Sequence, residues 1–348
     1  MRPRSRGDDR PGDRAASVAD GIGSPKARAA AADASDPAAL AKALNGTEVV
    51  VNSASYRLNL KVMKTCLRAC AHYLDLGGLY RITAKQLDRF APRDGADRFD
   101  AAGLLAVLGI GSSPGKTNLM AVQAARELGG SVDALHVSAA GRDMSPPEGF
   151  SIPYALQTLI DEITLKPVAL RSGRPVEIEP LTDGGKIDFG QPIGERGTIH
   201  TLHSELRTFG ESFGCRNASF RLSLEPKLLE RLRSLATCST ERIARESKRA
   251  APPSAKTVAV HVVEAAGAGS EMRVRCLTKP SRRWRLGGGI VSTASTMAAA
   301  VRLLARGEVT ARGALPPERC LDPDSLFAEL EKRGSAFEVE ATEGVVAT

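Results

Sequence analysis

Short apolar runs alternate with helix-length amphipathic segments through the first third of the chain. Glu48–Asn52 is a continuous β-branched run, typical of a strand buried on both faces of a parallel sheet. Leu58–Ala71 places its apolar residues close to helical spacing. His72–Leu76 and Gly103–Ile110 predict two further strands, with a helix at Ile82–Phe90 between them. This alternation with short links predicts an α/β fold with a doubly wound parallel sheet.

The pattern changes after about residue 129. Val132–Ser138 alternates like a strand, and Ile152–Thr164 has a helical period. Successive short β-like segments then predict an antiparallel sheet in a second, α+β layer. Helices return at Ser295–Arg306 and Ser325–Lys332. The β-like segments are Val168–Leu170, Val176–Ile178, Lys186–Phe189, Ser219–Leu224, Thr257–Glu264 and Glu271–Leu277.

A glycine-rich turn follows the strand predicted at Gly103–Ile110, and it allows two interpretations. A phosphate-binding loop requires G-x-x-x-x-G-K-[ST], whose backbone N–H groups surround the phosphates. Gly115, Lys116 and Thr117 fit that pattern, but the preceding glycine, Gly111, is one residue too close. No clear downstream strand ends in an aspartate that would hold magnesium. The sequence therefore disfavours a P-loop nucleotide triphosphatase and favours a turn that lies beneath a substrate.

Composition narrows the class of protein. The 348 residues are enough for two domains. The net charge of +8 is scattered, and its densest cluster, Arg282–Arg285, is too short for a nucleic-acid-binding stripe. We interpret the positive charge mainly as solvated surface, and binding of anionic ligands is the less favoured alternative. No apolar run of about 18 residues predicts a membrane span, and the basic N-terminus lacks a secretory signal. Six cysteines without metal or redox spacing indicate free thiols in the cytoplasm.

Taken together, the order and spacing of several motifs resemble the saccharopine dehydrogenase-like oxidoreductases, including saccharopine and lysine 6-dehydrogenases. The resemblance covers roughly residue 32 to the C-terminus. The matching segments are Ala32–Asp36, Glu48–Ala54, Val62–Cys66, His72–Gly78, Gly111–Asn118, Leu159–Thr164, Thr201–Glu205, Ala305–Glu308 and Leu315–Glu318.

The resemblance implies that NAD or NADP binds to the first domain and that a small amino-acid substrate lies under the second. The chemistry would be oxidation or reductive formation of a C–N bond in an amino acid such as lysine or saccharopine, by hydride transfer. It also implies a possible homodimer. The corresponding domains are a disordered or remnant segment at 1–30, a dinucleotide-binding domain at 31–128, an α+β substrate and dimerisation domain at 129–285, and C-terminal helices at 286–348 that return to the first domain.

The chain departs from the family at its N-terminus. The family opens with a strand and a G-x-G-x-x-G turn that places the pyrophosphate at a helix N-terminus. Here Gly21–Ser24 resembles a fragment of that turn, and Ala16–Asp20 could end a strand. We interpret the first β-α unit as missing and the chain as N-terminally truncated. The alternative function is therefore a catalytically impaired remnant or a binding module of the same fold.

Candidate site residues follow from the resemblance and from their positions at predicted strand ends. For each, an ordinary structural role is the alternative. A zinc site at His200, His203 and Glu205 lacks the H-E-x-x-H pattern, so we predict no metal. The candidates are Lys116 and His203 for catalysis; Asp20, Asp33, Asn52, Ser53 and Ala54 for the cofactor; and Tyr56, Asp75, Ser113 and Asn118 for the substrate.

Overall fold

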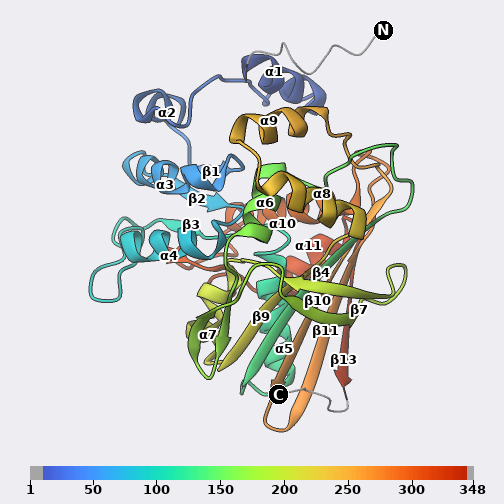
Figure 1. Cartoon of the computed structure of the whole chain (residues 1–348). Helices are drawn as coiled ribbons and strands as arrows, with labels where there is room; N and C mark the ends of the chain where they lie inside the picture. Colours follow the sequence, from blue (N-terminus) through green and yellow to red (C-terminus); the bar gives the residue numbers. More distant parts are fainter. Residues whose placement is uncertain (1–10, 343–348) are drawn as a thin grey trace.

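A computed structural model describes residues 11–342, and two β-sheets organise it (Figure 1). The smaller sheet has the order β1-β2-β3-β12, and each of its neighbouring pairs is parallel. Its strands are β1 (Val49–Asn52), β2 (His72–Asp75), β3 (Leu105–Val107) and β12 (Gly313–Leu315). The parallel sheet expected from the β-branched runs is therefore confirmed.

Helices cover both faces of this sheet. Neighbouring residues of a strand point to opposite faces, so consecutive residues of β2 pack against different helices. Tyr73 packs with Met63 of α3 (Asn59–Arg68) and Phe90 of α4 (Leu79–Phe90). Leu74, the next residue of β2, instead packs with Leu119 of α5 (Lys116–Glu127) and with α10 (Gly288–Ala305) and α11 (Pro323–Glu331). The sheet is thus doubly wound, as its alternating sequence pattern predicts.

The larger sheet has nine strands and is mostly antiparallel. Its main order is β13-β11-β10-β4-β9-β5-β6, with β7 and β8 branching from β9. One neighbouring pair, β4 with β9, is parallel. The strands are β4 (Ala134–Asp143), β5 (Val168–Arg171), β6 (Arg174–Glu177), β7 (Asp183–Asp188), β8 (Glu195–His200), β9 (Asn217–Ser223), β10 (Thr257–Gly267), β11 (Ser270–Thr278) and β13 (Ser335–Thr342).

Helix α5 joins the two sheets. Its Leu119 belongs to the core beside the parallel sheet, whereas Met120 and Ala124 belong to the core of the large sheet. The first residues of α5 are therefore buried at the junction of the two layers. The remaining helical elements are α2 (Pro37–Ala43), η1 (Tyr56–Leu58), α6 (Leu156–Thr164), η2 (Glu205–Arg207), α7 (Phe209–Phe213), α8 (Pro226–Ala236), α9 (Thr240–Arg249) and η3 (Pro317–Arg319).

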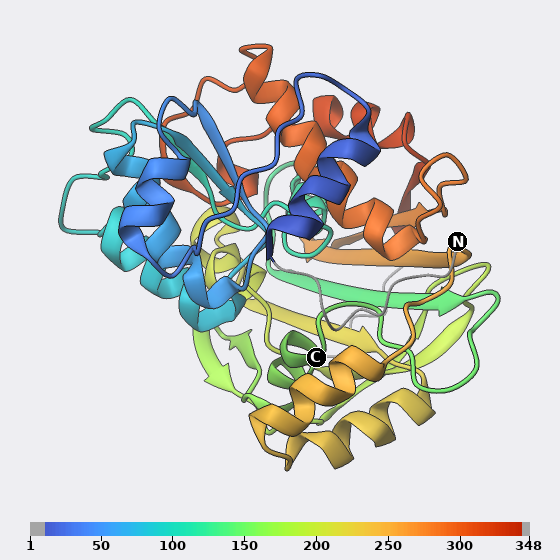
Figure 2. The same cartoon turned by 90° about the horizontal axis from the view of Figure 1, so that it is seen from above.

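The C-terminal segment contributes to both layers. Strand β12 pairs with β3, whereas β13 pairs with β11 in the large sheet. Helix α10 lies beside the blue strand β1 (Figure 2), whose Val49 packs against the core that contains Leu303, although the two elements are far apart in sequence. Helix α10 alone among the described helices is long and apolar enough to cross a membrane, but half of it is buried within this fold. Its apolar composition is accounted for by the core that it shares with α11.

Two segments differ from the sequence-based expectation. Pro11–Ile22 forms helix α1, where disorder to about residue 14 and a strand at 16–20 were expected. Pro11 starts this helix, since a first-turn proline removes only an N–H that would be unpaired anyway, and Gly23 follows its end with φ 64°. Residues 1–10, also expected to be disordered, lie outside the described part of the chain. The charged, proline-bearing stretch Glu241–Ser254 predicts a surface loop, but Thr240–Arg249 is helix α9, capped by the Ser239 hydroxyl.

Candidate functional site

A cleft of about 2200 Å³ lies between the two layers, at the carboxyl end of β1. The turn after β1, the Ser112–Pro114 turn and the start of α10 line it from the first layer. Helix α6, the segment at His203 and strand β10 line it from the second. Single ligand pockets usually measure about 300–1000 Å³, so this cleft has room for more than one small molecule. Ligands bind in this position, at the carboxyl ends of strands, in open α/β sheets.

The turn between β3 and α5 uses its backbone donors on itself. Gly111 N–H donates to the Pro114 carbonyl at 2.8 Å, and Lys116 N–H to the Gly111 carbonyl at 3.0 Å. The Asn118 side chain accepts from Gly115 N–H at 2.8 Å. A phosphate loop needs such N–H groups free to meet the anion. The geometry of this turn therefore argues against the P-loop interpretation, in agreement with the sequence.

His203 is buried between two carboxylates at the wall of the cleft. Its Nδ1 lies 3.5 Å from Glu205 Oε2, and its Nε2 lies 3.9 Å from Glu162 Oε1. Its ring stacks on Phe220 with centroids 3.4 Å apart. Nε2 has no hydrogen-bond partner among the described residues, and His203 lines the cleft. Since buried polar atoms are nearly always paired, this nitrogen is a candidate contact for a bound ligand.

The three groups differ in their preferred protonation. Burial opposes a charge on His203, but the nearby Glu205 carboxylate, together with Glu162, outweighs it and raises the pKa of His203. Burial also disfavours a charge on Glu205, yet His203 and the Ser113 hydroxyl hold its pKa below the usual range. For Glu162 burial dominates and raises the pKa. Relative to the isolated side chains, these shifts favour the charged forms of Glu205 and His203 and the neutral form of Glu162. Proton transfer requires a proton donor and a proton acceptor placed in this way beside the reacting group.

A second polar chain runs from the cleft to Lys116. Ser112 Oγ lies 3.0 Å from His261 Nε2 and 2.7 Å from Ser292 Oγ. Lys116 Nζ lies 2.7 Å from Ser292 Oγ and 3.3 Å from His261 Nδ1. Ser112 and His261 line the cleft, whereas Lys116 is fully buried behind them. Burial lowers the pKa of Lys116 and lowers that of His261 well below its usual value, with Lys116 adding to the latter.

Two candidate substrate residues have structural contacts instead. Asp75 is buried and accepts from the backbone N–H groups of Gly77 and Gly109, both at 2.8 Å, besides several side chains. Asn118 caps the Gly115 turn and donates to Glu318 at 2.7 Å. Neither residue lines the cleft. These contacts support a structural role for both residues. Neither side chain is placed to contact a substrate directly.

The turn after β1 brings together the candidates Asn52, Ser53 and Ala54 at the cleft. Asn52 is buried, donates to Asn59 Oδ1 at 2.9 Å and accepts from Ala54 N–H at 3.2 Å, so it fixes the turn. Tyr56 also lines the cleft, but its hydroxyl donates to Asp161 at 2.6 Å. Burial, then that carboxylate, raises the pKa of Tyr56. Ser113 lines the cleft as well and donates to Glu205 at 2.5 Å.

The two N-terminal cofactor candidates are not at the cleft. Asp20 lies on helix α1 and is exposed, so it does not end a strand. Asp33 is exposed in a turn, where it accepts from Ser35 N–H at 2.7 Å. Gly21 and Gly23 lie at the end of α1 rather than between a strand and a helix. The prediction that Gly21–Ser24 is a fragment of a glycine-rich phosphate-binding turn is therefore wrong.

Sequence reasoning missed three residues of the cleft: Glu162, Ser112 and His261. Glu162 interrupts the buried face of α6 and His261 the apolar run of β10, whereas Ser112 lies in the turn before α5. A charged residue on a buried helical face was the signal that could have identified Glu162. No group of three His, Cys, Asp or Glu side chains converges as metal ligands within residues 11–342.

Comparisons with known proteins show which family the chain resembles. Residues 9–107 match the family model described as the saccharopine dehydrogenase NADP binding domain. Over 229 residues the chain is 27% identical to carboxyaminopropylagmatine dehydrogenase of Synechocystis sp. (strain ATCC 27184 / PCC 6803 / Kazusa), covering 65% of this chain and 57% of that protein. Both matches indicate that the saccharopine dehydrogenase family is the one that this chain resembles. The cofactor class of that family, NAD(P), is the one expected from the sequence.

A solved structure agrees with the family on the fold. The structure of apo saccharopine dehydrogenase (L-Glu forming) from Saccharomyces cerevisiae matches with a TM-score of 0.63. The match covers 94% of this chain and 91% of that one, at 13% sequence identity. At this low identity the match shows that the two proteins share a fold, with the same arrangement of two layers. It confirms the α/β class with a second domain.

The described residues fit one end of an NAD(P) molecule better than the other. At the nicotinamide end, the turn Asn52–Ala54 and the unpaired Nε2 of His203 face the same cleft. At the phosphate end, β1 is an edge strand that pairs only with β2 within residues 11–342. No glycine-rich turn of this part of the chain lies beside β1 to bind the pyrophosphate. Asn52, Ser53 and Ala54, which line the cleft, therefore stay the candidates for contact with the nicotinamide.

Proposed function

We propose that this protein, which is similar to the saccharopine dehydrogenase family, is an NAD(P)-dependent oxidoreductase that acts on the C–N bond of an amino acid such as saccharopine or lysine. The observation that carries the proposal is His203, whose unpaired Nε2 faces the cleft while Glu205 holds the other ring nitrogen. A carboxylate at Nδ1 orients the imidazole and supports its charged form. This is the arrangement that a proton-transferring histidine requires.

Oxidation at a C–N bond removes a hydride from carbon and a proton from nitrogen, leaving a C=N group. When bound, the cofactor supplies the hydride acceptor. Water then adds to the C=N carbon, and the C–N bond breaks to give a carbonyl group and an amine. His203 carries protons at Nε2, since that atom alone of the ring is free to meet water or the substrate nitrogen. The Glu205 carboxylate, 3.5 Å from Nδ1, favours the charged form of the ring, and the raised pKa of Glu162 limits the negative charge beside it.

The charge of the cleft supports a substrate with carboxylate groups. Six basic side chains line it, against three acidic ones. Guanidinium groups bind carboxylates through two parallel hydrogen bonds, which fixes their orientation. The similar dehydrogenase from Synechocystis is named for a substrate with carboxyl and amino groups, which favours the same class here. The basic residues are Arg57, Arg142, Arg196, Lys227, Arg231 and Arg302, and the acidic ones are Asp143, Glu162 and Glu225.

The test is turnover by the purified chain with NAD⁺ or NADP⁺ and saccharopine, lysine or carboxyaminopropylagmatine, followed by the absorbance of the reduced cofactor. We expect turnover with at least one of them and a loss of about 10²–10⁴-fold in kcat for His203→Asn. A folded protein that binds no reduced cofactor up to about 1 mM would instead support the alternative of a catalytically impaired family member. Cofactor binding without turnover of any amine would reject the proposed substrate class.

Two further features stay predictions of the same proposal. We place the protein in the cytoplasm, because its six cysteines are all free thiols. Fractionation of the source cells tests that location. We also propose a homodimer, on the resemblance to the family. Light scattering of the purified chain tests the oligomeric state.

A further inference from the structure

A second pocket, of about 550 Å³, lies away from the active-site residues, beside the C-terminal half of α10. Three segments build it: the loop Pro280–Trp284, helix α10 and the end of α11. Of its lining residues, Arg302 also lines the large cleft. The full lining is Pro280, Ser281, Arg282, Arg283, Trp284, Arg302, Arg306, Glu329, Lys332 and Arg333.

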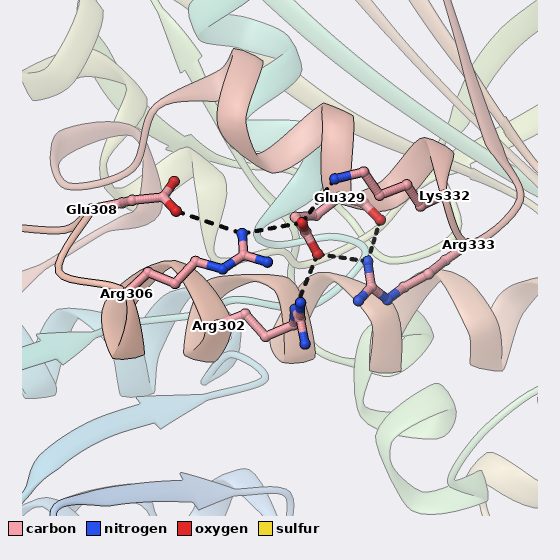
Figure 3. Close-up of polar contacts among 6 residues, drawn as sticks. All are labelled: Arg302, Arg306, Glu308, Glu329, Lys332 and Arg333. Carbon is pink, nitrogen blue, oxygen red and sulfur yellow. Dashed lines mark hydrogen bonds and ion pairs between the residues drawn. The ribbon is translucent and has the colours of Figure 1, made fainter.

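One buried carboxylate organises four of the cations in this pocket (Figure 3). Glu329, 3% exposed, lies 3.2 Å from Arg302 Nε and from Arg306 Nη1. It lies 3.1 Å from Lys332 Nζ and 2.9 Å from Arg333 Nη1. A single acid thus holds four basic side chains in fixed positions around the pocket. Such fixed positions reduce the conformational entropy that these side chains would lose on binding an anion.

The positive charge is not balanced within the pocket. Six cations and one carboxylate line it, and the nearby Glu308, 3.5 Å from Arg306, adds one more negative charge. Arg282 and Arg283 are exposed and pair with no carboxylate in the described part of the chain. Arg302, Arg306 and Lys332 remain 51%, 42% and 66% exposed, so a solute can reach them. Like charges held this close repel one another, and a bound polyanion would relieve that repulsion.

The loop that carries Arg282 and Arg283 is itself held in place. Ser281 and Leu286 exchange two backbone hydrogen bonds, at 2.9 and 3.2 Å, which close the loop. Between them lies Trp284, the one tryptophan of the chain, 44% exposed and part of the pocket wall. An exposed indole ring beside several guanidinium groups is a surface on which nucleobases stack.

We propose that this pocket binds a nucleoside polyphosphate, with the phosphates on the arginine and lysine cluster and the base against Trp284. Guanidinium forks match phosphate oxygens in geometry as well as charge. The pocket volume lies within the range of ordinary small-molecule sites. This inference does not depend on the proposed dehydrogenase activity, since neither Trp284 nor Arg283 lines the large cleft.

The experiment is a titration of the purified full chain with ATP, inorganic tripolyphosphate and adenosine at low salt. Because Trp284 is the one tryptophan, its fluorescence reports this pocket, and calorimetry provides a second readout. We expect saturable binding of ATP, weaker binding of tripolyphosphate and none of adenosine. Equal binding of ATP and tripolyphosphate, or no binding of ATP by calorimetry, would overturn the proposal.

Variants locate the binding site. Arg282→Gln combined with Arg283→Gln should weaken ATP binding by roughly tenfold or more, because two charge-assisted contacts are lost. Trp284→Phe should weaken ATP but leave tripolyphosphate unchanged. Arg171→Gln combined with Arg174→Gln is the matched control, since both arginines are exposed on the β5–β6 hairpin, at the opposite edge of the large sheet from β13. If the Arg282→Gln and Arg283→Gln double variant binds ATP as tightly as the wild type, the anion binds elsewhere and the proposal is overturned. The same holds if the control variant weakens ATP binding equally.

Discussion

The Nδ1 atom of His203 lies 3.5 Å from Oε2 of Glu205, and both side chains are buried where the two layers of the fold meet. Glu205 is in turn fixed from the other layer, because Thr117 at the start of α5 donates to it at 2.9 Å. The carboxylate that orients the histidine is therefore tied to the helix that joins the two sheets.

Glu205→Gln should lower the pKa of His203. Burial lowers the pKa of His203, and the nearby carboxylate of Glu205 is the main cause that raises it above the usual value. Without that charge, burial prevails and the neutral imidazole is favoured. NMR titration of the histidine ring measures the shift directly, with His203→Asn assigning the signal. Glu177→Gln, which removes an exposed carboxylate on β6, is the control and should leave the titration unchanged. An unaltered His203 titration in Glu205→Gln would contradict the assignment.

Gly115→Ala should destabilise the protein by roughly 2–4 kcal/mol, as expected for backbone strain added to a steric clash. Gly115 has φ 122°, and a Cβ there would lie 2.5 Å from the backbone N and O of Gly111. Gly129→Ala is the matched control, because Gly129 also has a positive φ, 71°, but has nothing within 4 Å of its Cβ position. The control should cost only about 1 kcal/mol. Urea unfolding measures both, and equal losses would mean that the close approach to Gly111 is unimportant.

The parallel sheet could be predicted because its signals are local. The β-branched run at Val49–Asn52 and the helical period after it need no knowledge of the rest of the chain. The same holds for the turn at Gly111–Thr117, whose spacing already excluded a phosphate loop. Its physical reason, the use of the N–H groups inside the turn, became visible only in the structure.

The polar cluster around His203 could not be predicted in full, because it is tertiary. Glu162 comes from α6 and Glu205 from η2, and their positions in sequence do not indicate that one imidazole lies between them. Lys116 illustrates the same limit, since its sequence position indicated a cleft residue but tertiary packing buries it behind His261. The error at α1 has a different cause: an isolated polar segment carries little apolar pattern, and its helix follows from its proline start and glycine end.

Lys116→Met should raise stability at neutral pH, with an advantage that shrinks as the pH rises. Burial lowers the pKa of Lys116 in the folded protein, whereas the unfolded chain keeps a value of about 10.4. Between these two values the unfolded state binds more protons, so the wild-type free energy of unfolding increases with pH, and the variant lacks that increase. Urea unfolding at neutral and at alkaline pH measures the difference. Lys42→Met, an exposed lysine of α2, should show no such pH dependence. A gap that is constant with pH would mean that Lys116 stays charged when folded.

Glu329→Gln should destabilise the protein at neutral pH by about 1–2 kcal/mol, because four partly exposed ion pairs lose their common acceptor. Hydrogen bonds from Lys332, Arg333 and Arg306 outweigh burial and lower the pKa of Glu329 to about 2. The stabilisation is therefore complete above the unfolded value of about 4.3 and is lost as the pH falls toward 2. Urea unfolding at neutral pH and at about pH 3 should show the difference between wild type and variant shrinking with acid. Glu331→Gln is the control, since that exposed carboxylate of the same helix makes no ion pair within residues 11–342. If the loss were the same at both pH values, the four cations would be held by packing of their side chains rather than by the charge of Glu329.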